Sequence, residues 1–319
     1  MKVIYDGSYE EKTIRVLMGE FMPELLNSDD RLYYLDADLM NCINTMEWAM
    51  EHGEKAQNCG IAEANMAGIA AGMASVGFKP IIHSFGPFAS RRMYDQVFLS
   101  AAYAKNPITV LGSDPGVAAE YNGGTHMPFE DMSLYRAIPD STVIDVTDSV
   151  MLKDVLKQTA DIPGVKYIRM DRKACVKMYE EGSHFEIGKA IEIKEGADVA
   201  IFACGMMVAE SLKAAKELEK EGISAAVIDV FTVKPLDEEM VLKYAEKCGC
   251  IVTAENHSRI GGLYSAVAEL LSAKKPTPVE WVAVDDRFGQ VGPMDFLQEQ
   301  YNLTVNDIVE KAKLAISRK

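Results

Sequence analysis

The sequence has few basic residues for its length and no long apolar run. It contains 33 lysines and arginines against 48 aspartates and glutamates, a formal net charge of −15. A surface of this charge repels nucleic-acid phosphates and anionic lipid headgroups, so we expect neither nucleic acid nor a membrane as a partner. No window reaches the roughly 18 consecutive apolar residues of a membrane-spanning helix, and the first residues, MKVIYDGSYEEK, turn acidic where a secretion signal would be apolar. The six cysteines are scattered, several within apolar runs as reduced buried thiols are, and we expect a cytoplasmic protein.

Motifs of three common enzyme classes are absent. The sequence has no G-x-G-x-x-G turn, no G-x-S-x-G and no H-E-x-x-H. Cys248 and Cys250 are too close together for a C-x-x-C site and have no histidine pair beside them. The dinucleotide fingerprint, the hydrolase serine elbow and the zinc-protease site are therefore excluded, and we expect no metal ligands on this chain.

Short apolar, β-branched runs alternate with helical patterns along almost the whole chain. Strands are predicted over residues 32–35, 79–84, 108–112, 142–146, 165–170, 199–204, 225–230, 250–254 and 279–284, and helices over 12–26, 62–73, 91–105, 149–159, 207–220, 237–247 and 262–271. Such alternation is typical of parallel sheets covered by helices on both faces. At about 150 residues per domain the length suggests two domains, and the charged segment 172–196 suits a linker. We predict an α/β protein of two doubly wound sheet domains, residues 1–185 and 186–319.

Three loops of the first domain follow predicted strands, where an open parallel sheet binds ligands. They are residues 36–38, 83–92 and the long glycine-rich segment 112–130. Phe85 and Phe88 could form a ring-stacking site or simply belong to the core. His126 follows two glycines, and in such a loop packing explains a histidine poorly, so a function is favoured.

The helix pattern over residues 59–74 consists almost wholly of small and apolar residues, with a single carboxylate, Glu63, near its start. Gly68 and Gly72 would let another backbone approach closely, as at a buried helix crossing. Glu63 would then have little contact with solvent, as a proton-handling group often does. The alternative is an ordinary first-turn glutamate that interacts with the helix dipole.

Several motifs occur in a fixed order in the first domain: I-A-E-A-N-M-A-G-I-A-A-G-M-A (61–74), S-F-x-x-F (84–88), R-x-Y-D-Q (92–96), G-G-T-H (123–126), L-Y-R-A-I-P (134–139) and Y-I-R-M-D-R (167–172). Together they resemble the pyrimidine-binding domain of thiamine-diphosphate-dependent transketolases. T-A-E-N-H-S-R-I-G-G-L (253–263) resembles the transketolase C-terminal domain. The resemblance covers nearly the whole chain and implies transfer of a two-carbon glycolaldehyde unit from a ketose to an aldose.

The resemblance assigns roles on the cofactor side. Glu63 matches the catalytic acid that hydrogen-bonds N1′ of the aminopyrimidine and thereby promotes loss of the proton on thiazolium C2. Phe88, with Phe85 nearby, matches the aromatic wall against that ring, and Asp38 matches an acid close to the cofactor. His126 matches a catalytic histidine that hydrogen-bonds the two-carbon unit. The cofactor would supply the carbanion chemistry and the protein would supply binding and proton control.

The resemblance also implies a substrate side with departures from the family. Four arginines match positions at or near those that bind the anionic end of the sugar, although surface ion pairing would explain them equally: Arg92, Arg136, Arg169 and Arg172. Asn122 stands where transketolases commonly have Asp, Asp114 where a phosphate-contacting histidine is frequent, and residues 41–42 where a serine is common. Because these changes cluster on the substrate side, we expect an anionic sugar other than the usual pentose phosphates.

Single-chain transketolases have a further domain that holds the diphosphate through Mg²⁺, and no G-D-G run of that domain occurs in this sequence. The resemblance therefore implies a split enzyme, in which an N-terminal transketolase subunit supplies the diphosphate and Mg²⁺ sites and forms a heterotetramer with this chain. Two other functions stay open, the beta subunit of a 2-oxo acid dehydrogenase's decarboxylating component and a non-catalytic regulatory paralogue. The roles of His83 and His257 also stay open.

Overall fold

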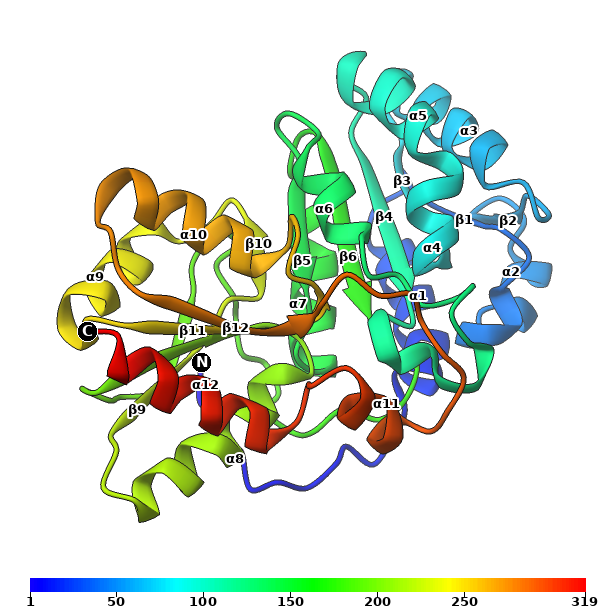
Figure 1. The fold of residues 1–319 in the computed structure, drawn as a ribbon. Helices are drawn as coiled ribbons and strands as arrows, with labels where there is room; N and C mark the ends of the chain where they lie inside the picture. Colours follow the sequence, from blue (N-terminus) through cyan, green and yellow to red (C-terminus); the bar gives the residue numbers. More distant parts are fainter.

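The computed structural model describes all 319 residues and contains two β-sheets flanked by helices (Figure 1). The seven-stranded sheet has the order β10-β5-β6-β4-β3-β1-β2, and the five-stranded sheet has the order β12-β11-β8-β9-β7. The strands of the first sheet are β1 (Leu32–Asp36), β2 (Ala56–Asn58), β3 (Lys79–Phe85), β4 (Ile108–Ser113), β5 (Thr142–Asp145), β6 (Val165–Met170) and β10 (Thr232–Lys234). Those of the second are β7 (Ile191–Lys194), β8 (Val199–Ala203), β9 (Ala225–Asp229), β11 (Ile251–Ser258) and β12 (Val279–Val284).

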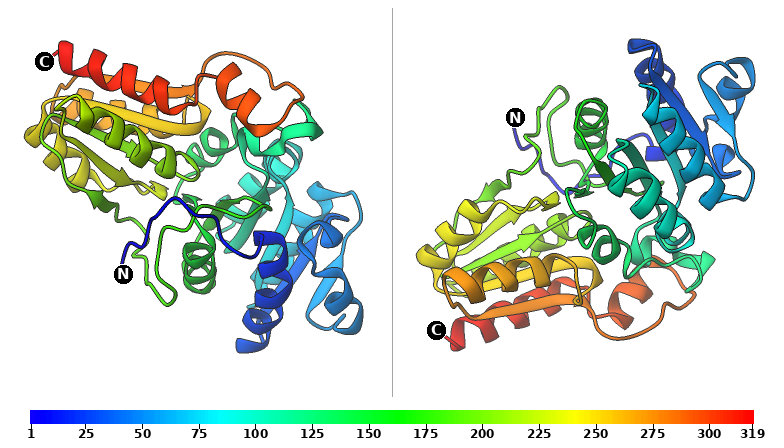
Figure 2. Two further views of the ribbon diagram at one scale, coloured as in Figure 1. Left: turned by 90° about the horizontal axis from the view of Figure 1, so that it is seen from below. Right: turned by 90° about the horizontal axis from the view of Figure 1, so that it is seen from above.

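Helices cover both faces of each sheet, as Figure 2 shows from two further directions. Those of the first half are α1 (Ile14–Ser28), α2 (Met46–Glu51), α3 (Glu63–Ser75), α4 (Gly86–Ser90), α5 (Tyr94–Gln96), α6 (Asp131–Arg136) and α7 (Ser149–Thr159). The second half has α8 (Met207–Lys220), α9 (Glu238–Cys248), α10 (Leu263–Lys274), α11 (Met294–Gln300) and α12 (Val305–Ser317). Three 3₁₀ segments, η1 (Met40–Ile43), η2 (Arg91–Met93) and η4 (Gly116–Asn122), and one π-helix, η3 (Val97–Tyr103), complete the set. None of the helices combines the length and hydropathy needed to cross a bilayer.

The predicted fold class is confirmed, and the expectation of purely parallel pairing needs a correction at the edges. Within the first sheet β1 to β6 pair in parallel, and β8, β9, β11 and β12 pair in parallel in the second. The short edge strands β10 and β7 are antiparallel to β5 and β9. All residues of β4 and β6 are buried, as expected for strands covered on both faces.

Two hydrophobic cores fill the space between sheets and helices. One lies under α1, α7, α8 and α12, and the other lies under α3, α6, α9 and α10. Each core contains residues of both sheets, so the two halves of the chain are packed as continuous layers rather than as separate globules.

The domain boundary at residue 185 stays a prediction. Segments after this residue nevertheless pack against segments before it. β10 comes from the second half and pairs with β5 of the first, as Figure 1 shows. α11 packs against η4, which lies in the long loop after β4. The second half therefore contacts the loop that carries predicted site residues.

The helix predicted over residues 91–105 is present as far as Tyr103, but it is not a regular α-helix. The structure instead has α4, the single turn η2, the short α5 and then a π-helix. π-Helical turns inside helices are rare and occur frequently at functional sites. Two neighbouring arginines, Arg91 and Arg92, lie in the turn η2 that comes before the π-helix.

Candidate active site

Glu63 is the first residue of α3 and is 1% exposed. Its carboxylate accepts hydrogen bonds from Arg92 Nη1 at 2.8 and 2.9 Å and from Ser84 Oγ at 3.2 Å. Ser84 lies near the carboxyl end of β3, so the sheet brings the serine under the helix start. Glu63 is thus a buried acid at the carboxyl edge of a parallel sheet and also a first-turn residue of α3, so its catalytic role stays a proposal.

Three rings form an aromatic group beside this carboxylate: Phe85, Phe88 and His126. The Phe85 and Phe88 centroids are 6.4 Å apart, and His126 lies edge-on to them at 5.7 and 5.1 Å. Phe85 ends β3 and Phe88 belongs to α4, whereas His126 comes from the loop after β4. His126 Nδ1 lies 2.8 Å from Thr125 Oγ1, which fixes the ring orientation. The structure therefore assembles the aromatic and histidine residues that the sequence singled out.

A cleft lies beside η4. It is lined by charged and polar side chains of η4 and its neighbours, among them Arg15, Asn122, Arg172 and Lys173. Arg172 is 26% exposed; its Nε donates to both carboxylate oxygens of Asp114 at 2.7 and 2.8 Å, and its guanidinium lies 4.8 Å from the Phe85 centroid. Asp114, which is buried, has a φ of 60° at the start of the loop.

Arg15 was not predicted as a site residue. Its Nε donates to Asn44 Oδ1 at 3.0 Å and its Nη2 donates to the carbonyl of Asn41 at 3.0 Å. The residue lies in the first turn of α1, about a hundred positions before the loop that it faces. No local pattern distinguishes such an arginine from a surface charge, and only the tertiary fold places it in the cleft.

Asp38 lies just beyond β1 and is exposed. Its backbone N–H donates to Asn58 Oδ1 at 3.1 Å, and its carboxylate accepts from Asn58 Nδ2 at 2.9 Å. A φ of 65° gives it the left-handed conformation that aspartate tolerates at a turn. Its proposed place near the cofactor stays a proposal.

His83 belongs to a buried chain of polar groups beneath the site. Its Nδ1 lies 2.8 Å from Asp36 Oδ2, and its Nε2 lies 3.0 Å from Ser113 Oγ. Tyr34 Oη also donates to Asp36 Oδ2 at 2.5 Å, and all four side chains are fully buried. This network of polar groups links the carboxyl ends of β1, β3 and β4. Asp38, Phe85 and Asp114 lie at these three strand ends.

Two of the predicted substrate arginines lie elsewhere. Arg169 is fully buried, and its guanidinium contacts Asp131 at 2.8 Å and Asp145 at 2.9 Å. Arg136 Nη1 donates to the carbonyls of Gly261 and Gly262 at 2.6 and 3.2 Å, and its Nη2 contacts Glu269 at 2.9 Å. The Arg169 guanidinium is therefore held by two aspartates of the first half and that of Arg136 by groups of the second half, and neither lines the cleft beside η4.

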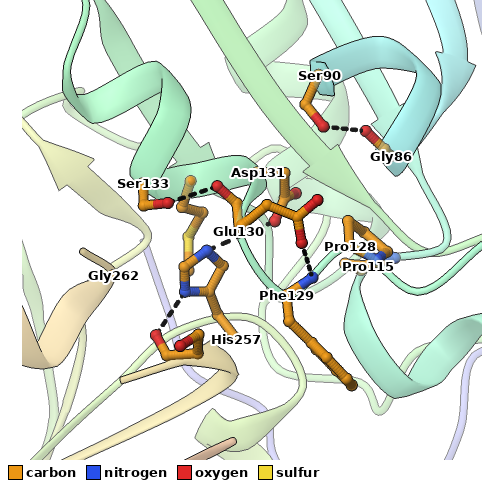
Figure 3. A network of polar contacts seen from close by, with 12 residues as sticks. Gly86, Ser90, Pro115, Pro128, Phe129, Glu130, Asp131, Ser133, His257 and Gly262 are labelled. Atoms are coloured by element: carbon orange, nitrogen blue, oxygen red, sulfur yellow. Dashed lines mark hydrogen bonds and ion pairs between the residues drawn. The ribbon is translucent and has the colours of Figure 1, made fainter. Parts of the chain in front are cut away.

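His257 joins the same interface (Figure 3). Its Nε2 lies 3.7 Å from Asp131 Oδ1, and its Nδ1 lies 2.7 Å from the carbonyl of Ser258. Burial lowers the pKa of His257 to about 4, so the ring is neutral at physiological pH. The ring packs between β11 and the start of α6.

The glycines of α3 do not mark a helix crossing within the chain. A Cβ added at Gly68 or Gly72 would meet no atom within 4 Å. Exposed apolar side chains surround them on α3, on the turns beside it and on η3: Ile61, Ile69, Val76, Phe78, Leu99 and Tyr103. We call this surface of exposed apolar residues the α3 face.

The site fits one end of thiamine diphosphate. A buried carboxylate beside the face of an aromatic ring can accept a hydrogen bond from a protonated or N–H-bearing heterocycle and stack against it. The chain assembles no group of three or more histidine, cysteine, aspartate or glutamate side chains with metal-site geometry. Glu63, Phe85 and Phe88 would thus contact the pyrimidine.

Comparisons with known proteins agree with this geometry. Residues 10–176 match the model of the transketolase pyrimidine-binding domain, and residues 188–308 match that of the transketolase C-terminal domain. A 6-deoxy-6-sulfo-D-fructose transketolase subunit from Clostridium sp. (strain MSTE9) is 46% identical over 315 residues, covering 99% of this chain and 98% of that protein. One subunit of an apulose-4-phosphate transketolase from Phocaeicola vulgatus is 33% identical over 82% of this chain and 84% of its own length.

A solved structure described as a split-gene transketolase in an inactive beta4 tetramer superposes with a TM-score of 0.88. It is 37% identical and covers 96% of this chain and 98% of its own. Both domain models, the curated relatives and the site point the same way: this chain belongs to the transketolase family.

Proposed function

We propose that this chain is the C-terminal subunit of a two-subunit, thiamine-diphosphate-dependent transketolase. It would transfer a glycolaldehyde unit from a ketose that carries a terminal anion to an aldose. The observation that carries the proposal is Glu63, a buried carboxylate beside an aromatic group that Arg172 of the neighbouring cleft contacts at Phe85. Bound thiamine diphosphate would supply the carbanion-stabilising chemistry of such an enzyme.

The residues of the chain have distinct tasks in this proposal. Glu63 accepts a hydrogen bond from the pyrimidine N1′ and controls the proton there, and Phe88 and Phe85 orient the ring and exclude water. His126, edge-on to both rings, donates a hydrogen bond to an oxygen of the two-carbon unit. Asp38 is assigned to the cofactor side and Asn122 to the sugar.

The anionic end of the sugar is assigned to the cleft. Arg172 and Arg15 present guanidinium groups there, and a planar guanidinium suits a phosphate or a sulfonate. The names of the relatives specify one sulfonated and one phosphorylated sugar. A tetrahedral terminal anion is therefore the substrate feature that we assign, with Asn122 and Asp114 as the departures that distinguish this sugar from pentose phosphates.

An N-terminal subunit would complete the site with Mg²⁺ and the diphosphate-binding residues. A related beta4 tetramer is described as inactive, which supports the need for a partner. The exposed α3 face would pack against another subunit of a heterotetramer, because an apolar surface of this kind is typical of interfaces. Six unpaired cysteines suit a protein of carbohydrate metabolism in the reducing cytoplasm.

The test is reconstitution with a split-transketolase N-terminal subunit. We expect ketose-to-aldose transfer only from the mixture supplied with thiamine diphosphate and Mg²⁺, fastest with 6-phospho- or 6-sulfo-ketoses and lost with Glu63→Gln. Acetyl transfer from pyruvate to a lipoyl domain would instead indicate a 2-oxo acid dehydrogenase subunit. Cofactor binding without any turnover would indicate a regulatory paralogue.

A further inference from the structure

Arg92 occupies the space between the two groups that we assign to the cofactor's pyrimidine. Its Nη1 donates to both oxygens of Glu63 at 2.8 and 2.9 Å, and its Cζ lies 3.9 Å from the centroid of Phe88. The guanidinium is thus hydrogen-bonded to the buried carboxylate and lies over the face of the ring.

An aminopyrimidine at this place would use the same two contacts. It too is planar, offers N–H groups to a carboxylate and presents a flat face to an aromatic ring. At 3.9 Å from the Phe88 centroid the guanidinium is in van der Waals contact with the ring face. One planar group fills that space, so the two occupants exclude each other.

The Arg92 side chain can move away from the site into solvent, whereas Glu63 cannot. The Arg92 side chain is 43% exposed, whereas that of Glu63 is 1% exposed. Arg92 sits in η2, the single turn between α4 and α5, where the helix is already broken. The preceding Arg91 points to a different partner, with its Nε 2.9 Å from Glu130 Oε1.

Resting on the function proposed above, we propose that Arg92 is an internal competitor of the cofactor. Its guanidinium closes the Glu63–Phe88 site while no cofactor is bound and must swing out before the pyrimidine can enter. The apparent dissociation constant of the cofactor then equals the intrinsic one divided by the fraction of molecules in which Arg92 is out. The arginine also neutralises a buried carboxylate that would otherwise have only Ser84 as a partner.

The experiment is a titration of thiamine diphosphate, with saturating Mg²⁺, into the complex with an N-terminal transketolase subunit, followed by intrinsic fluorescence and calorimetry. We compare wild type with Arg92→Met, Arg92→Lys and the matched control Arg91→Met. Arg92→Met should bind about tenfold tighter, as expected if Arg92 is out in about a tenth of molecules. Arg92→Lys keeps the charge but loses the planar group, so its dissociation constant should lie between those of wild type and Arg92→Met. The dissociation constant of Arg91→Met should match that of wild type.

A second measurement uses the chain alone. Arg92→Met should unfold at a lower urea concentration than wild type, because Glu63 loses its counter-ion, and Arg91→Met should not. A loss of stability without the cofactor together with tighter binding of the cofactor is the signature of a competitor, since a merely structural arginine would weaken both.

Two outcomes overturn the inference and are distinguishable. If Arg92→Met and Arg92→Lys bind the cofactor no tighter than wild type, while Glu63→Gln weakens binding, Arg92 is not a competitor and the proposed function stands. If wild type does not bind thiamine diphosphate, or Glu63→Gln leaves its affinity unchanged, the proposed function fails and the inference fails with it.

Discussion

Two arginine–carboxylate clusters in this chain use the same chemistry for opposite purposes. In the Glu63–Arg92 pair the acid is buried and the arginine is 43% exposed, so the guanidinium has another place to go. In the Asp131–Arg169–Asp145 cluster all three side chains are buried and the guanidinium also reaches the carbonyl of Asn256 at 3.0 Å. The first pair is displaceable and lies where a ligand can compete for it. The second is locked within the first half of the chain, and its bond to the Asn256 carbonyl links it to the second half.

The difference shows that an arginine motif alone does not identify a binding residue. The five N–H groups of Arg169 face two carboxylates, two carbonyls and a thioether, so none is left for a ligand, whereas a guanidinium with a single partner and an open side has several. Four predictions test this distinction.

The largest effect is expected for Arg169→Met. It leaves two buried aspartates without their counter-ion, and breaking a buried ion pair typically costs about 3–5 kcal/mol. Arg92→Met should cost about 1 kcal/mol or less in the chain alone, because this arginine is partly solvated. Urea unfolding of both variants measures the contrast. Equal losses would mean that the two clusters are energetically alike.

The second effect is on activity. Glu63→Gln keeps the size and one acceptor oxygen but cannot take or release a proton, so turnover of the reconstituted enzyme should fall by about 10²–10⁴-fold. The urea midpoint of the chain should change little, since Arg92 can still donate to the amide oxygen. A variant with near-normal turnover would place the proton-handling group elsewhere.

The third prediction concerns the pH dependence of stability that arises from Asp229, a buried carboxylate with no arginine partner. Asp229 accepts only hydroxyl donors, Thr147 Oγ1 and Tyr179 Oη, each at 2.7 Å, and burial raises its pKa to about 7. Because the unfolded pKa is about 3.9, the folded state binds the proton more tightly and this side chain makes stability fall as pH rises from 4 to 7. Asp229→Asn cannot titrate, so its stability relative to wild type should rise across that window by about 2–4 kcal/mol.

Urea unfolding curves of wild type and Asp229→Asn, both recorded at pH 4.5, 6 and 7.5, measure this difference in the free energy of unfolding. A pH-independent offset would show that Asp229 is ionised throughout, with a normal pKa despite its burial.

The smallest effect separates a cleft arginine from an interface arginine. Arg172→Gln should raise KM for a phosphorylated or sulfonated ketose about tenfold, as loss of one charge-assisted contact does, and leave KM for an uncharged ketose unchanged. The matched variant Arg136→Gln should leave both KM values unchanged and lower the unfolding midpoint. If both variants raised KM alike, the contrast between cleft and interface would be wrong.

Much of this architecture can be predicted from sequence. All nine predicted strands occur, because buried parallel strands are continuous apolar runs that stand out locally. The edge strands β2, β7 and β10 were missed, since strands of three or four residues carry almost no pattern. The amphipathic helix α12 was also missed, although Thr304 and Asp307 form a capping box at its start.

The residues of the site also fall into those that the sequence could predict and those that it could not. Glu63, Phe88 and His126 were predictable because each lies within a short, ordered motif next to a strand end. Arg15 was not, because its position depends on how α1 crosses the sheet. Arg136 and Arg169 were predicted as substrate residues from motif position, and nothing in the motif reveals the aspartates and carbonyls that consume their donors.

Strand β10 belongs to the second half of the chain but pairs with a strand of the first sheet, and this limits where the gene can be split or recombined. It follows residue 185 in the chain yet closes one edge of the first sheet. A recombination event that replaced the second half by that of a distant relative would also replace this edge strand, and a gene split between the halves would leave β5 with bare backbone groups open to other strands. Evolution and protein engineering can therefore divide this family in front of the pyrimidine-binding domain far more readily than behind it.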